Sequence, residues 1–330
     1  LTGVTAVMNN NQYRCVVSGA AGCSAANSSA ATLTVNTAPD ITTQPASSTI
    51  CATQSTSFSV QVTGTALSYQ WQESTAGCGG PWVNVANGGV YSGGTTATLT
   101  ITGAPISMNG YGYRCIITGT CTPSATSACA QLTVNTPVNI TTQPVNSTVC
   151  AGANTTFGVA ATGTSPTYQW QESTNGGGTW NNITNGGIYG GATTNTLALT
   201  GVTAGMNNYQ YRCIVSGAAA CAAVNSGSAV LTVDTAPAIT TQPATGAAVC
   251  GGQVKTYSVA ANGTALTYQW QESTNGGTSW NPVTNGGIYG GANTNTLTLT
   301  GVTVAMNNNQ YRCIISGTCA PSATSSAVTI

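Results

Sequence analysis

The chain has 330 residues, of which five are Lys or Arg, five are Asp or Glu and none is His, so its formal net charge is zero. A neutral surface has no electrostatic attraction for phosphate backbones or anionic membranes, which argues against nucleic acid as a partner. No stretch approaches the roughly 18 to 20 apolar residues of a membrane helix, so membrane insertion is not expected. Hydrophobic residues make up 41% of the chain, enough to build several cores, and we expect a folded, β-rich protein.

Internal repeats define the organisation of the chain. The motif Tyr-x-Cys recurs with a period near 99 residues, which is the size of a domain. The similar segments "TVNTAPDITTQP", "TVNTPVNITTQP" and "TVDTAPAITTQP" mark short, Pro-containing links between the repeats. We therefore predict a partial domain at 1–36 and complete domains at 37–135, 136–234 and 235–330.

The first segment begins inside a repeat. Its opening "LTGVTAVMNN" aligns with "LTGVTAGMNN" and "LTGVTVAMNN", which lie in the middle of later repeats. Half a sandwich would expose its core face. We expect it to be completed either by further residues of the same chain or by another copy.

Hydrophobic residues alternate with a period of two within each repeat, as in "TLALT" and "TLTLT". This alternation is typical of half-buried strands, and glycine clusters such as "NGGIYGG" indicate the turns between them. Several short strands per 99 residues favour a β-sandwich.

Three spaced motifs resemble an immunoglobulin-like domain. Tryptophan in "YQWQ", then an L-x-L/I strand and then Y-x-C look like strands C, E and F of that fold. The resemblance, which extends over the whole chain, implies an all-β fold of tandem immunoglobulin-like β-sandwich domains. The short links predict an elongated rod.

The repeats are similar to those in extracellular adhesins and fibre proteins of Bacteroidota. The family's tyrosine corner would have Tyr113 hydrogen-bond back to the loop before its strand.

One family feature is missing. The strand-B position at which the family places its first cysteine holds Val60, Val159 and Val259, so the usual disulfide between strands B and F cannot form.

Cysteine usage is the richest signal in the sequence. Thirteen cysteines without a histidine favour an oxidising location, extracellular or at the cell surface, over a zinc site. Three cysteines recur: one before strand B (Cys51, Cys150, Cys250), one in strand F (Cys115, Cys213, Cys313) and one in the loop after it (Cys121, Cys221, Cys319, with Cys23 in the partial domain). Cys78 and Cys129 occur only in the second repeat, which predicts that they pair.

The sequence leaves two pairings of the recurring cysteines open. The first links the cysteine before strand B to strand F, as Cys51–Cys115, Cys150–Cys213 and Cys250–Cys313. It leaves the loop cysteines Cys23, Cys121, Cys221 and Cys319 for bonds between domains or chains. The alternative is a bond within the F–G hairpin, such as Cys115–Cys121.

The arginines also follow the repeat, at Arg14, Arg114, Arg212 and Arg312, each between the tyrosine and the strand-F cysteine. Alternation along strand F turns them outward. We expect cross-strand pairs with Glu73, Glu172 and Glu272, although strict alternation from Trp71 turns Glu73 inward. The other interpretation is that the arginines make contacts between chains.

The sequence does not indicate an enzyme. It has no histidine for general-base chemistry and no repeat with a carboxylate pair, and we expect neither a metal nor another cofactor. A second tryptophan in each repeat (Trp82, Trp180, Trp280) either stacks on sugars or packs beside a turn. The exposure of these rings distinguishes the two roles.

These observations predict a structural extracellular protein, a repeat segment of a cell-surface filament or fibre whose partners are copies of itself. The alternative is a glycan-binding or adhesive module of a long single-chain adhesin, with surface glycans as partners.

Overall fold

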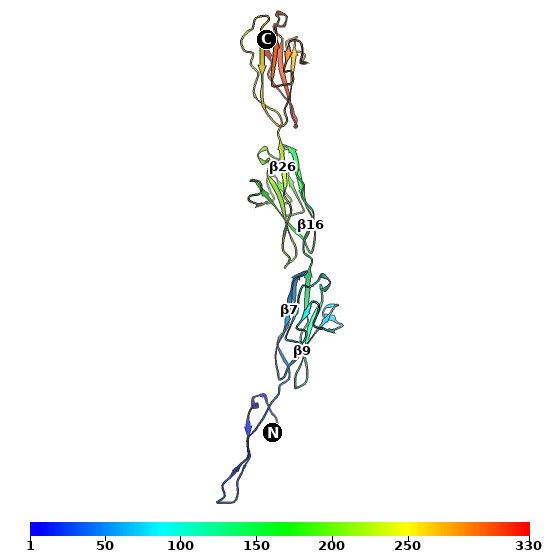
Figure 1. Ribbon diagram of the computed structural model, residues 1–330, viewed down its shortest axis with the longest axis vertical. Coiled ribbons are helices and arrows are strands. Elements are labelled where there is room, and N and C mark those ends of the chain that lie inside the picture. The colour runs from blue at the N-terminus through cyan, green and yellow to red at the C-terminus, as the bar shows by residue number, and fades with distance from the viewer. The chain divides into compact units, whose positions relative to one another are not determined.

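The computed structural model describes residues 1–330 and contains β-strands and short 3₁₀ turns but no α-helix. No helical segment is long and apolar enough to cross a membrane. We call the segments 1–36, 37–135, 136–234 and 235–330 repeats 1 to 4. Repeats 2, 3 and 4 each form a β-sandwich of their own (Figure 1).

Contacts group the chain into two compact units. The first consists of Leu1–Asn139, Thr162–Pro166 and Ser216–Ala223, and the second consists of Ile140–Ala161, Thr167–Val215 and Val224–Ile330. Two loops of repeat 3 therefore belong with repeat 2 in the first unit.

Repeat 1 contains only short, exposed strands. Its elements are η1 (Ala6–Met8), β1 (Gln12–Tyr13), β2 (Val16–Val17), β3 (Ala26–Asn27) and β4 (Ala31–Thr32). Strand β1 pairs with β4 and β2 pairs with β3, both antiparallel.

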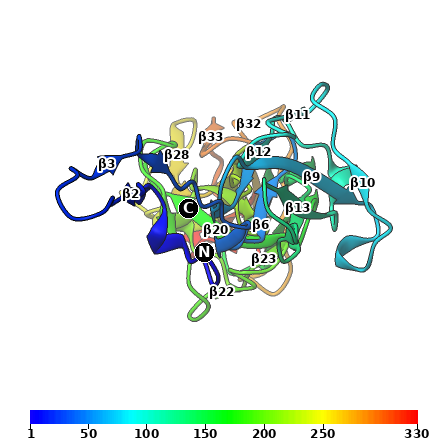
Figure 2. The same ribbon diagram turned by 90° about the horizontal axis from the view of Figure 1, so that it is seen from below.

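Repeat 2 has the strand order of the immunoglobulin-like sandwich. Its elements are β5 (Asp40–Thr43), β6 (Ser48–Cys51), β7 (Thr56–Ser59), β8 (Gln61–Thr63), β9 (Ser68–Ser74), η2 (Gly77–Gly79), β10 (Val83–Asn84), β11 (Tyr91–Ser92), β12 (Thr98–Ile101), η3 (Ile106–Met108), β13 (Gly112–Thr118), β14 (Ala125–Thr126) and β15 (Ala130–Asn135). One sheet has the order β10-β9-β13-β15-β6 and the other has β11-β12-β7. Strands β9 and β13, which correspond to strands C and F, pair along their whole length. Figure 2, an end-on view, shows the two strands side by side.

Repeat 3 follows the same plan. Its elements are β16 (Asn139–Thr142), β17 (Ser147–Cys150), β18 (Thr155–Gly158), β19 (Ala160–Thr162), β20 (Thr167–Ser173), β21 (Asn181–Asn182), β22 (Tyr189–Gly190), β23 (Thr196–Leu199), η4 (Ala204–Met206), β24 (Gln210–Ser216), β25 (Val224–Asn225) and β26 (Ala229–Asp234).

Repeat 4 lacks one strand of this plan. Its elements are β27 (Ala238–Thr241), β28 (Val254–Ser258), β29 (Ala260–Asn262), β30 (Thr267–Ser273), β31 (Asn281–Pro282), β32 (Tyr289–Gly290), β33 (Thr296–Thr300), η5 (Val304–Met306), β34 (Gln310–Ser316), β35 (Ala323–Thr324) and β36 (Val328–Thr329). Residues 247–250, which align with β6 and β17, form no strand.

The core of each complete repeat is built around the strand-C tryptophan. Trp71 is fully buried, and its indole N–H donates to the Thr96 carbonyl oxygen at 3.0 Å. Cys115 lies opposite Trp71 in the register of β9 and β13 and is also fully buried. Val60 is buried where the family has a cysteine. The two sheets are therefore held together by apolar packing, with a free thiol in the place of the family's disulfide.

Candidate functional site: disulfide-linked joints and an arginine–tryptophan face

Two disulfides connect successive repeats. Cys51 of repeat 2 is bonded to Cys221 of repeat 3, with their Cα atoms 5.0 Å apart, and Cys150 of repeat 3 is bonded to Cys319 of repeat 4, at 5.8 Å. The pattern is the same at both joints: the cysteine before strand B of one repeat bonds to the loop cysteine of the next. The predicted pairing of Cys51 with Cys115 and of Cys150 with Cys213 is therefore wrong.

The strand topology explains why Cys51 and Cys150 bond to the following repeat. Strand β6 runs parallel to β15, and its last residue, Cys51, lies opposite Asn135, the last residue of β15. Strands β17 and β26 repeat the arrangement, with Cys150 opposite Asp234. A cysteine at the end of such a strand lies where the chain leaves the repeat, beside the loops of the following one. Cys115 instead lies within its strand, in the core between the sheets.

The strand-F cysteines are thus free core thiols. Cys115, Cys213 and Cys313 are fully buried, and burial raises the pKa of each to about 11. Since the thiolate is the reactive form, these three groups are poorly reactive at neutral pH. The predicted Cys250–Cys313 bond is also wrong, because both of its cysteines are free. The same holds for the alternative Cys115–Cys121 bond.

Hydrogen bonds clamp each linker independently of the disulfides. At the joint between repeats 2 and 3 the Thr136 amide donates to Thr164 Oγ1 at 2.8 Å, and the Thr164 amide donates back to the Thr136 carbonyl at 3.1 Å. The Ala218 amide then donates to the Thr164 carbonyl at 2.8 Å. The same three-part arrangement occurs at the other two joints, formed by Thr37, Thr65 and Thr120 and by Thr235, Thr264 and Thr318.

Close packing at the linker requires glycine. Gly163 has φ of +130°, and a Cβ at this position would lie 2.9 Å from the Val138 Cα atom and from the Pro137 carbonyl oxygen. Asn135 adds a side-chain bond across the same joint, from its Nδ2 to the Ala219 carbonyl at 2.9 Å. The linker is therefore held by hydrogen bonds, packing and a disulfide together.

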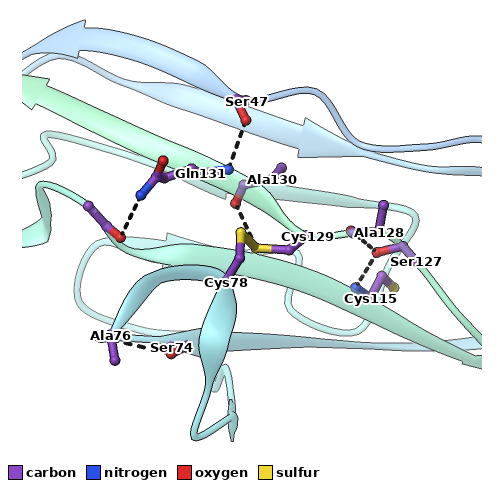
Figure 3. Close-up of a disulfide and its surroundings, with 11 residues drawn as sticks. Ser47, Ser74, Ala76, Cys78, Cys115, Ser127, Ala128, Cys129, Ala130 and Gln131 are labelled. Atoms are coloured by element: carbon purple, nitrogen blue, oxygen red, sulfur yellow. Dashed lines mark hydrogen bonds between the residues drawn. A yellow bond between two sulfur atoms is a disulfide. The ribbon is translucent and has the colours of Figure 1, made fainter.

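The third disulfide lies within repeat 2. Cys78, in η2, is bonded to Cys129, which directly precedes β15 (Figure 3). This pair was expected from the occurrence of both cysteines in this repeat alone. A Cβ at Gly112 would lie 2.9 Å from the Cys129 Sγ atom and 2.8 Å from the Gly77 backbone. Repeat 2 therefore has "YGYRC" where repeats 3 and 4 have "YQYRC" and "NQYRC".

The strand-F arginines stack on the second tryptophan of their repeats. The Arg114 guanidinium carbon lies 4.3 Å from the centroid of a Trp82 ring, and Arg114 Nε donates to Gln72 Oε1 at 2.9 Å. Repeats 3 and 4 have the same geometry in Arg212 with Trp180 and Gln171, and in Arg312 with Trp280 and Gln271. A cation–π contact of this kind contributes about 0.5 to 2 kcal/mol.

The predicted Glu–Arg cross-strand partner is wrong. Arg114 lies opposite Gln72 in the register, and Glu73 lies opposite Tyr113. Strict alternation from Trp71 turns Glu73 inward, as the sequence pattern also indicated, and Glu73 accepts a hydrogen bond from the Tyr91 hydroxyl. Arg14 lies in repeat 1, which has no tryptophan, and lines a shallow pocket with Gln12, Tyr13 and Ala30.

The strand-F tyrosine does not form the family's corner. The Tyr113 hydroxyl lies 3.1 Å from the Tyr91 hydroxyl, which in turn donates to Glu73. In repeat 4 the Tyr311 hydroxyl donates to Glu272 Oε1 at 2.6 Å. Asn109, four residues before Tyr113, instead accepts a bond from the Val134 amide at 2.9 Å. Each complete repeat therefore holds its glutamate with tyrosine hydroxyls.

The tryptophan geometry bears on the glycan hypothesis. Trp82, Trp180 and Trp280 are half-buried, and a guanidinium group lies over a ring of each. A sugar ring cannot stack on a face that an arginine already covers. The arrangement favours a structural role for these residues.

No group of three or more His, Cys, Asp or Glu residues in the structure is placed to bind a metal ion. The chemistry that these sites carry is cross-linking: disulfides at the joints, a disulfide within repeat 2, and polar clamps along each linker.

Comparisons with known proteins agree with the fold. Residues 139–235 match a family model described as a domain of unknown function, DUF8696. The solved structure of titin domains I67–I69 carrying E-to-A mutations has a TM-score of 0.65 and 18% identity, covering 89% of this chain and 98% of that one. The I-band fragment I67–I69 from titin gives the same TM-score and coverage at 19% identity. The chain is thus an all-β protein of tandem immunoglobulin-like domains.

A curated relative is similar over a shorter stretch. Endoglucanase C of Cellulomonas fimi is 32% identical over 190 residues, which is 57% of this chain and 16% of that protein. The chain therefore spans about a sixth of the length of this relative.

Proposed function

We propose that this chain is a repeat segment of an extracellular structural fibre, in which each immunoglobulin-like domain is covalently linked to its neighbours. The observation that carries the proposal is the repetition of one bond type at two joints, Cys51–Cys221 and Cys150–Cys319. Structural disulfides persist in oxidising surroundings outside the cytosol, which supports secretion or display at the cell surface.

Self-association is part of this proposal. Cys121 is the loop cysteine of repeat 2, and Cys250 is the cysteine before strand B of repeat 4; each corresponds to one half of a joint bond, and both are free. By the joint pattern, Cys121 would form a disulfide with the cysteine before strand B of a preceding repeat. Cys250 would form one with the loop cysteine of a following repeat. Cys23 of repeat 1 corresponds to Cys121. Another copy of this chain carries a matching cysteine for each of these positions, and we propose it as a partner.

A surface without net charge supports close association of copies. With five basic and five acidic residues, the chain has little like-charge repulsion to keep neighbouring copies apart. The arginines are engaged by tryptophan and glutamine within their own repeats, so we assign the contacts between copies to the loops and not to the arginines.

Immunogold labelling of intact producing cells, with an antibody raised against residues 136–234, tests the location. We expect gold particles along surface fibres, with a spacing that repeats. Label confined to permeabilised cells would overturn the proposal. A matched antibody that recognises only the reduced, unfolded repeat serves as the control for cell lysis.

A second assay tests association through the open cysteines. The purified chain, oxidised at high concentration, should form covalent multimers that disappear when Cys23, Cys121 and Cys250 are all replaced by serine. The control Cys15→Ser, at the exposed free thiol that occupies the strand-F position of repeat 1, should leave them unchanged. Multimers that persist in the triple variant, or a wild-type chain that stays monomeric, would contradict self-association through these positions.

A further inference from the structure

We propose that the joint disulfides give the chain two covalent paths between repeats 2 and 4, which we call tracks. Tension can then bypass the strands between Cys150 and Cys221 in repeat 3 instead of passing through them. This inference rests on the proposed structural function. It follows from the order in which the bonded cysteines occur: the span closed by Cys51–Cys221 overlaps the span closed by Cys150–Cys319.

The first track leaves repeat 2 at Cys51, the end of its second strand. It runs along β5 and β6 to Cys51, crosses to Cys221, and continues along β26 into the linker and β27 of repeat 4. The residues of repeat 2 after Cys51 and those of repeat 3 before Cys221 are not needed for this connection.

The second track runs beside the first in repeat 3, because β17 pairs with β26. It follows β15 into β16 and β17, reaches Cys150, crosses to Cys319 and continues into β36. Residues 151–220 belong to neither track; they carry Trp170 and most of the buried core of repeat 3, to which β26 adds Ala229, Leu231 and Val233. Residues 151–220 link Cys150 on the second track to Cys221 on the first, and we call this segment the rung.

The mechanical consequence differs from that of an ordinary tandem array. In such an array the chain enters each sandwich by its first strand and leaves by its last, so an opened domain adds its whole length to the tether. Here an opened repeat 3 stays bridged. The bonds close loops with sequence separations of 170 and 169 residues. Each loop withholds roughly 600 Å of extended chain, at about 3.3 to 3.6 Å per residue.

The free thiol in the core of repeat 3 is not placed to break the joint disulfides by thiol–disulfide exchange. Exchange requires a thiolate to attack a disulfide sulfur. Cys213 lies in the core of repeat 3, fully buried, and burial raises its pKa to about 11. Cys51 itself is buried at the joint. The repeat therefore keeps its own free thiol away from the bonds at both of its ends.

Cleavage of the rung tests the covalent topology. A protease site inserted between Gly186 and Gly187, in an exposed turn of repeat 3, allows the core to be cut after folding. The cut, oxidised chain should migrate as one species in denaturing gels without reductant. It should still do so when either joint bond is removed alone, by Cys51→Ser with Cys221→Ser or by Cys150→Ser with Cys319→Ser.

Only the variant without both joint bonds should separate into two fragments. The matched control, Cys78→Ser with Cys129→Ser, removes the bond inside repeat 2 and should leave the cut chain in one piece. Separation of the cut wild-type chain without reductant would overturn the proposal, as would separation of either single-bond variant.

Single-molecule stretching tests the load path. The cut, oxidised chain, held by tags at both termini, should stay tethered after repeat 3 opens and should break when reductant is added. In the uncut Cys150→Ser/Cys319→Ser variant, reductant should lengthen the fully stretched tether by roughly 600 Å, the length of the 170-residue loop. Rupture of the cut tether without reductant would refute the two tracks. Failure to find the protein on cell surfaces would refute the proposed function and leave this result unaffected.

Discussion

Repeats 3 and 4 have nearly the same core and different edges. In repeat 3, β17 pairs in parallel with β26 and ends in Cys150, which is bonded to the next repeat. In repeat 4 the aligned residues 247–250 form no strand, Cys250 is exposed and free, and a groove of about 220 Å³ borders them. Strand β34 nevertheless keeps the full register with β30. Repeats 3 and 4 therefore share the pairing of their core strands and differ at residues 247–250.

The groove of repeat 4 also holds the only lysine of the chain. Lys255 lines it and donates from Nζ to the Ala247 carbonyl at 2.6 Å. In repeat 3 the aligned residue is Thr155, whose hydroxyl lies 2.7 Å from that of Ser147 on β17. The lysine therefore reaches a backbone that in repeat 3 is held by a paired strand and a short hydroxyl contact.

The largest expected effect tests whether the two cores are equivalent. Trp170→Ala and Trp270→Ala should each lower the free energy of unfolding of their repeat by about 3 to 5 kcal/mol, because each removes a fully buried indole. Denaturant titration followed by near-ultraviolet circular dichroism measures both. A loss in repeat 4 that is much smaller than in repeat 3 would show that the cores differ, and Trp280→Phe, at a half-buried ring, serves as the control.

Removal of a joint bond should have the next largest effect. Cys150→Ser with Cys319→Ser should lower the free energy of unfolding by about 2 to 4 kcal/mol, since the bond restricts the unfolded chain. Hydrogen exchange should still show protected amides in β17, because its pairing with β26 does not need the disulfide. If β17 exchanges as fast as residues 247–250 in this variant, the disulfide and not the pairing orders the strand.

The arginine–tryptophan stack should contribute less. Arg212→Ala and Arg312→Ala should each cost about 0.5 to 2 kcal/mol and should shift the tryptophan fluorescence of their repeat. Arg212→Lys should recover part of the stability, since lysine keeps the charge but loses the planar contact and the bond from Nε to Gln171. Equal effects of Ala and Lys would show that packing alone stabilises this face.

Alkaline pH should produce the most gradual change. Burial is the main cause that raises the pKa of Tyr211 to about 12 and that of Cys213 to about 11. Both groups stay protonated in the fold at a pH at which the unfolded chain releases their protons. Stability should therefore be complete below about pH 8.5 and should fall as the pH rises to 12. Tyr211→Phe should flatten the fall between pH 10 and 12 in thermal melts, and an unchanged slope would assign it to other groups.

The strands were predictable because their signal is local. Alternating residues such as Leu197 and Leu199 identify a half-buried strand whatever it packs against, and Trp170 with the Tyr-x-Cys motif indicates the two strands that flank the core. Glycine turns and Pro-containing links are local as well. The pairing of Cys78 with Cys129 was accessible because both cysteines depart from the repeat together.

The partners of the recurring cysteines and arginines were not accessible in this way. The repeat shows that Cys51 and Cys115 occur in each complete domain, but only the parallel pairing of β6 with β15 places Cys51 beside the following repeat. The cross-strand register places Gln72 opposite Arg114, and a long side chain then selects Trp82 as its stacking partner.

The sequence by itself therefore determined the all-β class, the repeat and the residues of the core, because burial on one face of a strand leaves a period of two in the chain. Which cysteine bonds to which, and which side chain covers each tryptophan, was decided only in the tertiary structure. These contacts join residues that lie up to 170 positions apart, and their distance depends on strand direction and register.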